Sequence, residues 1–333
     1  MRADGPQFLA LIGPTASGKT DLSLALAEKV RIEVISMDSR QVYRGMDVGT
    51  DKVPASARAR VPHHGIDLVS PAERFSAGQF ARAARGWIAE IRERGALPVL
   101  VGGTGFFLRA VIDPVFGEPP LDEGRRDALR TYLRGRPPEE LGRWVDRLDP
   151  ARASLARAGG PQRLARTLEV ALLSGRALSW WHRTTPPEAA GLPGTIVLLD
   201  LPRPEMDRRI DERVGGMLDR GLVEEVRGLL AEGYGEDAPG MTGTGYREIA
   251  AYLRGEVSLE DALERMRSQT RRYARRQLTW FRHQLPASVH RVDAMESVER
   301  QVEAAIAAYE RDGGTVPWRP RQRGRREDDV RTV

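Results

Sequence analysis

The stretch FLALIGPTASGKT, residues 8–20, decides the fold. Its first five residues are apolar, which is typical of a short buried strand. The next eight have the P-loop pattern, in which two glycines enclose four residues and are followed by Lys19 and Thr20. Leucines at positions 22, 24 and 26 then mark a helical segment. A strand, a glycine-rich loop and a helix in this order predict the first unit of a parallel α/β sheet.

Such a loop binds phosphate mainly through its backbone. Glycines allow successive N–H groups to turn toward phosphate oxygens, and the helix that follows adds the positive end of its dipole. The Lys19 ammonium supplies a positive charge, and the Thr20 hydroxyl can ligate Mg²⁺. The alternative is a glycine-rich turn without a ligand, which the strand–loop–helix context disfavours. The loop alone does not reveal whether the bound phosphates belong to a nucleotide.

The rest of the chain continues the alternation of strands and helices. Further buried strands are predicted at residues 33–36, 97–101 and 195–200. Helices are predicted at about 76–94, with Ser76 as the cap and Gly95 at the end, and at about 204–232, 245–254 and 258–284. The predicted fold class is therefore α/β, with a P-loop NTPase-like parallel-sheet core flanked by helices and joined by right-handed crossovers.

Two segments depart from this pattern. Residues 118–190 lack strand signals, are rich in Arg, Ala, Leu and Pro, and predict an inserted, mostly helical domain. Residues 311–333 carry seven Arg and four acidic residues without periodicity, and predict a basic, disordered tail. We therefore expect a catalytic core of residues 1–117 plus 191–310, a helical insertion domain at 118–190, and the tail.

The composition excludes several classes of protein. The chain has 333 residues, 41% hydrophobic and 30% charged, as in a folded protein of about two domains. It has no cysteine, which rules out disulfides, thiolate catalysis and iron–sulfur clusters. The first apolar run is too short for a signal peptide or a membrane span, so we expect a cytoplasmic protein with no membrane partner. The net charge of +5 fits a phosphate or nucleic-acid partner without requiring one.

Two polar residues follow the strands predicted at 33–36 and 97–101. Ligands of open parallel sheets bind beyond the carboxyl ends of the strands, so Asp38 and Thr104 should face the same crevice as the P-loop. A carboxylate there can bind Mg²⁺, accept a hydrogen bond from a substrate, or act as a base. The alternatives are a cap of the following turn for Asp38 and a simple strand-to-helix turn around Thr104.

A stretch rich in arginine lies near the end of the core. Residues 265–291 contain eight Arg and no acidic residue, with Tyr273, Trp280 and Phe281 among them. Arginine pairs with phosphates and stacks on bases, so the stretch favours a nucleic-acid partner. The alternative is a solvated helix face with its aromatic residues packed on the core, although mixed charge is usual on such a face. The pair His63–His64 is interpreted as turn residues and not as a metal site.

Several motifs, in order, resemble one family, the tRNA dimethylallyltransferases. The resemblance covers about residues 8–310 and is specific because eight motifs occur together. They are GPTASGKT at 13–20, SMDSRQVYRGMDVGTDK at 36–52, VPHHGIDL at 61–68, FSAGQF at 75–80, LVGGTG at 100–105, PQRLARTLEV at 161–170, GYREI at 245–249 and YARRQLTWFRHQ at 273–284. The chain departs from the family pattern in having Thr244 before the GYREI motif and Arg275 where most members have Lys.

The resemblance implies a reaction. A dimethylallyl group would move from dimethylallyl diphosphate to N6 of the adenosine immediately 3′ of the tRNA anticodon, with release of diphosphate and a requirement for Mg²⁺. By matching position, Asp38 is the general base and Thr104 lies at the reacting centre. Diphosphate would be bound by Gly13, Pro14, Thr15, Ala16, Ser17, Gly18, Lys19 and Thr20, with Arg213 as a further ligand, and Thr20 would also ligate Mg²⁺.

The resemblance also implies which residues meet the tRNA anticodon stem-loop. Besides Asp38 and Thr104, the matching positions are Ser39, Arg40, Gln41, Arg126, Gln162, Arg163, Leu164, Ala165, Arg166, Thr242, Gly243, Thr244, Gly245, Tyr246, Arg247, Arg275, Arg276, Gln277, Leu278, Thr279, Trp280, Phe281 and Arg282. The expected partners are tRNA and dimethylallyl diphosphate, and we expect a monomer.

Two other functions share part of this pattern. A small-molecule kinase would use the same P-loop for ATP, but would not explain the arginine stretch or the later motifs. An RNA-binding module with an unused P-loop would bind tRNA without affinity for a donor, and the complete Lys19–Thr20 and Asp38 argue against it. Hydrolysis of ATP without tRNA would favour the first alternative, and tRNA binding without donor binding the second.

Overall fold

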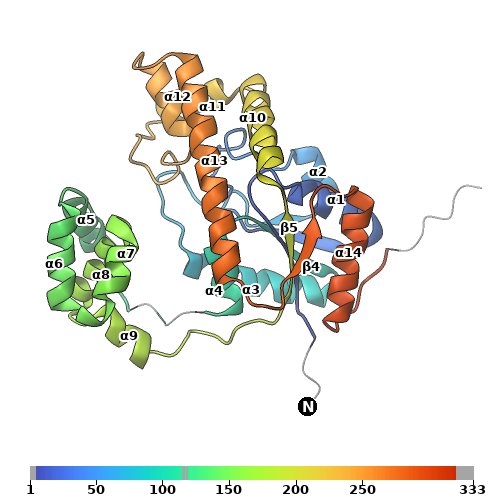
Figure 1. Cartoon of the computed structure of the whole chain (residues 1–333), viewed down its shortest axis with the longest axis horizontal. Helices are drawn as coiled ribbons and strands as arrows, with labels where there is room; N and C mark the ends of the chain where they lie inside the picture. The colour runs from blue at the N-terminus through green and yellow to red at the C-terminus, as the bar shows by residue number, and fades with distance from the viewer. Residues whose placement is uncertain (1–4, 115–116, 118, 320–333) are drawn as a thin grey trace, which may run out of the picture. The chain divides into compact units, whose positions relative to one another are not determined.

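The computed structural model describes residues 5–114, 117 and 119–319. A six-stranded sheet forms its centre, and each strand pairs in parallel with its neighbours in the order β3-β2-β4-β1-β5-β6. Strands β4 and β5 of this sheet are labelled in Figure 1. The strands are β1 (Leu9–Ile12), β2 (Ile32–Ser36), β3 (His63–His64), β4 (Leu97–Gly102), β5 (Thr195–Asp200) and β6 (His290–Asp293). The α/β fold with a parallel sheet, predicted from the sequence, is confirmed.

The described residues fall into two compact units, divided after Ile112 and again after Gly191. The first unit contains the sheet and the second contains the inserted helices. The divisions lie five residues before the expected boundary at 117/118 and one residue after the expected boundary at 190/191. The insertion thus leaves the sheet after β4 and its following helix, and the chain returns to form β5.

Helices cover both faces of the sheet in the first unit. They are α1 (Lys19–Lys29), α2 (Ala55–Arg60), α3 (Ala77–Glu93), α4 (Gly105–Ile112), α10 (Arg203–Asp219), α11 (Leu222–Ala231), α12 (Tyr246–Leu253), α13 (Leu259–Gln284) and α14 (Val298–Arg311). Helices α1 and α14 share one hydrophobic core, and α3, α4, α11 and α12 share the other. In β1, Leu9 and Leu11 face the first core while Ala10 and Ile12 face the second, as the period of a strand requires.

The register of the strands aligns the loops that form the site. Ile12, the last residue of β1, pairs with Gly102 of β4 on one side and with Leu198 of β5 on the other. Ser36, at the end of β2, pairs with Val101 of β4. The loops after β1, β2 and β4 therefore begin at one edge of the sheet, which is where ligands bind in folds of this kind.

Local sequence explains the boundaries of α3. The Ser76 hydroxyl accepts a hydrogen bond from the Gln79 N–H, and the Gln79 side chain accepts one from the Ser76 N–H, which makes a capping box. Gly95 follows the helix with φ of 67°, a conformation that glycine adopts at little cost. The cap and the end predicted for this helix are confirmed.

Two expectations from the sequence are wrong, and several elements were not predicted. The helix expected at 204–232 is two helices, α10 and α11, because Gly221 has φ of 90° between them. His63 and His64 are not turn residues but form β3, paired with Val34 and Ile35 of β2. The edge strand β6 and the helices α4 and α14 were not predicted.

The first residue predicted for the tail, 311, is also too early in the chain. Val316 is buried in the core that α1 and α14 share. The Arg31 N–H donates to the Pro317 carbonyl at 2.8 Å, and the Arg319 N–H donates to the Lys29 carbonyl at 2.9 Å. Residues 311–319 are thus part of the folded unit, while the rest of the predicted tail, 320–333, lies outside the described residues.

The second unit is helical, as expected for the insertion. It comprises α5 (Glu123–Arg134), α6 (Pro138–Leu148), the 3₁₀ turn η1 (Pro150–Arg152), α7 (Ala153–Ala158), α8 (Gly160–Ser174) and α9 (Leu178–Thr184). A small core of its own includes Leu133, Leu141, Val145 and Leu168. Across both units, none of the described helices is long and apolar enough to cross a membrane.

Candidate active site

The P-loop curls around an open space between β1 and α1. Ala16 and Gly18 both have positive φ, 66° and 85°, which turns the backbone before the helix begins at Lys19. A Cβ atom on Gly13 would lie 2.6 Å from the Ser17 Oγ, so this tight curl needs glycine. The first N–H groups of α1 have no partner within the helix and face the loop. The arrangement is that of an anion cradle.

Lys19 points back across this loop. Its ammonium donates to the Pro14 carbonyl at 2.7 Å and lies 3.1 Å from the Ser17 Oγ. Burial and the positive charge of Arg213 lower the pKa of Lys19 to about 7, although the negative charge of Asp38 opposes both effects. Burial of the ammonium without an anion is costly, so a bound phosphate would restore its charged form.

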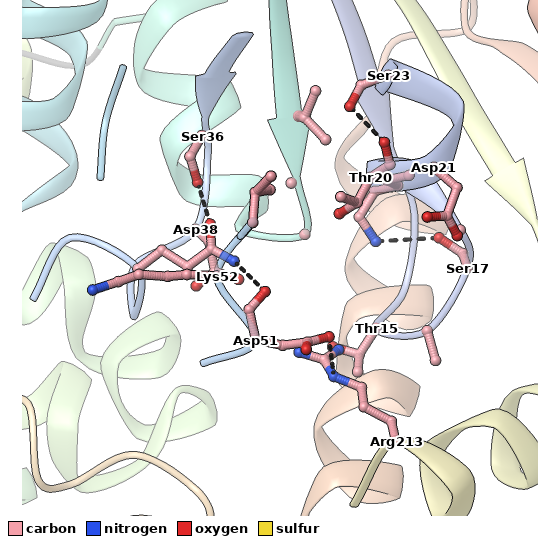
Figure 2. A pocket seen from close by; sticks show the side chains of 18 of the residues that line it. Thr15, Ser17, Thr20, Asp21, Ser23, Ser36, Asp38, Asp51, Lys52 and Arg213 are labelled. Carbon is pink, nitrogen blue, oxygen red and sulfur yellow. Dashed lines mark hydrogen bonds and ion pairs between the residues drawn. The ribbon is translucent and has the colours of Figure 1, made fainter. Parts of the chain in front are cut away.

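Asp38 both caps a turn and lines the site. Its Oδ1 accepts a hydrogen bond from the Arg40 N–H at 2.8 Å, which is the turn cap that the sequence left open. The same carboxylate lines the cavity that contains the P-loop (Figure 2). One oxygen is therefore used for local structure, and the group still faces the space where a substrate would bind.

Thr104 joins the turns that follow β2 and β4. Its Oγ1 accepts a hydrogen bond from the Ser39 N–H at 3.1 Å, and its own N–H donates to the Met37 carbonyl at 3.3 Å. A Cβ atom on Gly102 would lie 2.1 Å from that same Met37 carbonyl oxygen. Thr104 thus joins the turn after β4 to the turn that carries Asp38. Its place at the reacting centre stays a prediction.

Two cavities meet beside Asp38. The first, about 570 Å³, is lined by the P-loop from Thr15 onward. The second, about 430 Å³, is lined by Ser39 and Arg40, by residues 242–244 and 246–248, and by α13. Among the described residues, only Thr15, Asp38 and Arg213 line both cavities. These three residues therefore form the boundary between the P-loop cavity and the second cavity.

Arg213 is held at this boundary by Asp51. The Arg213 Nε lies 3.0 Å from the Asp51 Oδ2, and Arg220 binds the other oxygen of Asp51 at 2.7 Å (Figure 2). Asp51 has positive φ of 54°, which marks a tight turn. Sequence reasoning proposed Arg213 as a ligand but missed Asp51, because the two are far apart in the chain.

The predicted tRNA-contacting stretch of α13 has two faces. Arg275, Arg276, Thr279 and Arg282 are exposed, whereas Gln277 and Phe281 are buried, with only 7% and 3% of their surface exposed. These two side chains lie on the inner face of the helix and not on its exposed face. The prediction that they contact RNA therefore has no support from an exposed surface.

The arginine stretch is also compensated from another element. Arg271 binds Asp211 and Arg275 binds Asp207 at 3.3 Å, with both aspartates on the neighbouring helix α10 (Figure 1). The absence of acidic residues from the stretch 265–291 is therefore a weak signal for RNA, because acidic residues of another helix neutralise part of its charge. The exposed heads of Arg276 and Arg282 remain on its outer face.

Residues 242–247 lie beside Asp38. The Arg40 guanidinium donates to the Thr242 Oγ1 at 3.2 Å, and Thr242, Gly243, Thr244 and Arg247 line the second cavity. Gly245 has φ of 98° and begins α12. Tyr246 is only 1% exposed but lines the wall of the second cavity, so any contact that it makes with RNA would be made inside that cavity.

The other predicted RNA-contacting residues lie in the helical unit. Arg126 and Arg166 both bind the carboxylate of Glu169, which also binds Arg130 and is only 2% exposed. The three arginines keep the pKa of Glu169 below its usual value although burial raises it. Of the remaining members, Gln162 and Arg163 are exposed, Ala165 is half-buried and Leu164 is buried in the core of the unit.

The site suits a magnesium ion held partly by a ligand. Among the described residues there is no group of three or more His, Cys, Asp or Glu side chains that could bind a metal alone. The exposed Thr20, together with Asp21 and Asp38, lines the P-loop cavity. Mg²⁺ usually takes one or two protein oxygens plus phosphate oxygens and waters, so these donors fit it.

Comparisons with known proteins agree with this geometry. A family model described as IPP transferase matches residues 41–284, and one described as isopentenyl transferase matches residues 6–58. The tRNA dimethylallyltransferase of Geobacillus thermodenitrificans (strain NG80-2) is 41% identical over 281 residues, covering 84% of this chain and 89% of the relative. That of Nocardioides sp. (strain ATCC BAA-499 / JS614) is 41% identical over 304 residues, covering 91% and 97%.

Solved structures are similar over the same range. The full-length tRNA isopentenylpyrophosphate transferase from Bacillus halodurans has a TM-score of 0.65 and 36% identity, with 92% of this chain and 97% of that chain covered. A eukaryotic dimethylallyltransferase, studied acting on tRNA, has a TM-score of 0.77 and 26% identity, covering 93% and 80%. The parallel sheet and the P-loop after its first strand place the chain among the P-loop proteins. The chain belongs to the IPP transferase family of enzymes.

Proposed function

We propose that this enzyme transfers the dimethylallyl group of dimethylallyl diphosphate to N6 of the adenosine immediately 3′ of the anticodon in tRNA. The observation that carries the proposal is the position of Asp38, on the boundary between the P-loop cavity and the second cavity. A donor diphosphate in the first and an adenine in the second would meet beside this carboxylate. The names of the relatives, all tRNA dimethylallyltransferases, supply the donor and the acceptor.

The chemistry assigns a role to each side of the boundary. As the bond forms between N6 and the allylic carbon, the bond from that carbon to the diphosphate oxygen breaks. The proton on N6 moves to the Asp38 carboxylate, because the amino group is a poor nucleophile until it loses that proton. The P-loop N–H groups, Lys19 and Arg213 stabilise the negative charge that develops on the leaving diphosphate.

The proposed metal acts on the same leaving group. Mg²⁺ would be held by the Thr20 hydroxyl and phosphate oxygens, and would supply charge stabilisation to the diphosphate. The base must leave its stack to enter the second cavity, as for other enzymes that modify bases within folded nucleic acids. Arg40 and Arg276, which line that cavity, are positioned to bind the adjacent backbone phosphates.

The experiment measures transfer of label from allyl-labelled dimethylallyl diphosphate to unmodified tRNA with an adenosine beside the anticodon, in the presence of Mg²⁺. Asp38→Asn keeps the shape and the cap but cannot accept the proton, so kcat should fall by about 10²–10⁴-fold with tRNA affinity little changed. Asp219→Asn, an exposed change at the end of α10, is the matched control and should leave the rate unchanged.

Three outcomes would contradict the proposal. Absence of label with the folded parent protein, together with ATP consumption, would favour a kinase. Tight tRNA binding without donor binding would favour an RNA-binding module. A large loss of tRNA affinity in Asp38→Asn, with the rate at saturation unchanged, would make Asp38 a binding residue and not the base.

A further inference from the structure

Helix α13 sends two polar side chains toward the site from its inner face. Tyr273 and Gln277 are four residues apart, so they lie one above the other on the same side of the helix. Tyr273 lines the second cavity and Gln277 lines the P-loop cavity. Neither has a role in the function proposed above, and the sequence placed Gln277 on the RNA-contacting surface.

The Gln277 amide joins two loops of the site. Its Oε1 accepts a hydrogen bond from the Thr15 N–H at 2.9 Å, and its Nε2 donates to the Gly103 carbonyl at 3.0 Å. These partners fix which end of the amide is oxygen, because an N–H needs an acceptor and a carbonyl needs a donor. A Cβ atom on Gly103 would lie 2.1 Å from the Gln277 Nε2, so the amide packs directly against this glycine.

The Tyr273 hydroxyl contacts the other loop residue of the site. The Tyr273 side chain interacts with that of Thr104, whose Oγ1 accepts the Ser39 N–H at 3.1 Å. One helical turn further along α13, Gln277 contacts Gly103, the neighbour of Thr104. Burial, with a contribution from the negative charge of Asp38, raises the pKa of Tyr273, so the phenol remains protonated. Thr104 is therefore fixed from two directions, by the turn that carries Asp38 and by α13.

We propose that Gln277 and Tyr273 are positioning residues that hold the two halves of the site. Gln277 holds the P-loop against the turn after β4, so that the remaining N–H groups of the loop face the donor diphosphate. Tyr273 holds the Thr104 hydroxyl in one orientation beside Asp38. The inference rests on the proposed function, and it assigns different kinetic effects to two residues one helical turn apart.

The first test uses Gln277→Leu, which keeps the volume but removes both hydrogen bonds. Without these bonds the P-loop should bind the donor diphosphate more weakly. The dissociation constant for dimethylallyl diphosphate, measured by calorimetry without tRNA, should rise about tenfold. The donor KM should rise in parallel, while tRNA affinity stays within about twofold. Gln284→Leu, the same change at the exposed end of α13 where Gln284 binds Arg109, is the control and should change neither constant.

The second test uses Tyr273→Phe, which removes only the hydroxyl. It should lower kcat about tenfold with the donor KM little changed, because Thr104 would lose its fixed orientation. In a Thr104→Val background the same change should have no further effect, since the partner is already gone. Tyr309→Phe removes a buried hydroxyl that bonds the distant Pro6 carbonyl, and should affect stability without changing kcat.

The outcomes separate the inference from the function. An inactive parent that binds no donor would contradict the proposed function itself. If the parent is active, two results would overturn the role of Gln277. In one, Gln277→Leu binds the donor normally. In the other, it loses donor affinity and tRNA affinity equally and has a lowered Tm. Independent effects of Tyr273→Phe and Thr104→Val would overturn the role of Tyr273.

Discussion

At the residue scale, the titration of Lys19 should make donor binding depend on pH. Its pKa is lowered to about 7 in the free protein, and a bound diphosphate favours the charged ammonium and raises it. Above pH 7, binding should therefore take up a proton, and the dissociation constant for dimethylallyl diphosphate should increase with pH by up to about tenfold per unit. Calorimetry at pH 8 in buffers with different ionisation enthalpies measures this uptake directly.

The control variant is Lys19→Arg, which keeps a positive charge at position 19 but does not lose its proton in this pH range. The guanidinium of Lys19→Arg stays charged at this pH, so donor binding by this variant, although weaker, should show no proton uptake. Uptake of the same size in Lys19→Arg would assign the proton to another group and contradict the role of Lys19. The free energy of unfolding changes with pH in the opposite direction to donor affinity. The unfolded chain binds the Lys19 proton more tightly than the folded chain, so the contribution of Lys19 to stability becomes more favourable as pH rises from about 7 to 10.5.

Single residues of the site were predictable to different degrees. Asp38 and Thr104 could be placed from sequence because each follows a strand whose apolar run is unmistakable, and parallel strands end at one edge. Gln277 and Asp51 could not be assigned their roles, because their partners Thr15, Gly103 and Arg213 are distant in the chain. Contacts between distant loops depend on packing, which no local pattern records.

At the scale of elements, one carboxylate joins α11 to the loop after β2. Glu225 accepts hydrogen bonds from the N–H groups of Asp47, Val48 and Gly49 at 2.7, 2.6 and 3.0 Å, and from the Tyr246 hydroxyl at 2.6 Å. Burial and the charge of Glu225 raise the pKa of Tyr246, so this phenol remains a donor. The loop therefore depends on a helix nearly two hundred residues later for its backbone partners.

Removal of this carboxylate should destabilise the first unit. Glu225→Ala leaves several donors without their acceptor, and should lower the free energy of unfolding by about 3 kcal/mol. Urea unfolding measures this as a lower midpoint with an unchanged m-value. Glu224→Ala, at the exposed neighbouring position that pairs with Arg227 at 3.4 Å, should change it by less than about 1 kcal/mol. Equal effects of the two substitutions would show that Glu225 contributes only as a surface charge.

The elements missed from the sequence share a physical cause. β3 has two residues and β6 has four, of which only Val292 is buried, so neither gives an apolar run. Edge strands of this kind are defined by the strand they join. The sequence prediction missed the boundary between α10 and α11 because Gly221 lies within a continuous helical pattern. The turn of the chain at this point is evident only from the φ of 90° at Gly221.

At the scale of the whole molecule, the outer face of α13 should supply charge for tRNA binding. Arg275→Ala with Arg276→Ala should weaken tRNA binding and reduce the slope of log K against log salt by about 1.5, because two phosphate contacts are lost. Arg300→Ala with Arg311→Ala makes the same change of charge on α14, and should leave the slope unchanged. Equal slopes for the two double variants would assign the arginines of α13 to structure, through Asp207 and the ring of Tyr273.

The two glycines at the end of β4 differ in how freely they can evolve. At Gly102 a side chain would meet the Met37 carbonyl, which is backbone, and no substitution elsewhere can remove it. At Gly103 the severe contact, at 2.1 Å, is with the end of Gln277, which a substitution can shorten, while the Gly13 carbonyl oxygen lies at 3.3 Å and requires only a small shift. Position 103 can therefore change only along a path in which position 277 changes too, whereas position 102 has no such path. Drift in this turn is consequently coupled to drift in a helix that lies more than 170 residues away in the sequence.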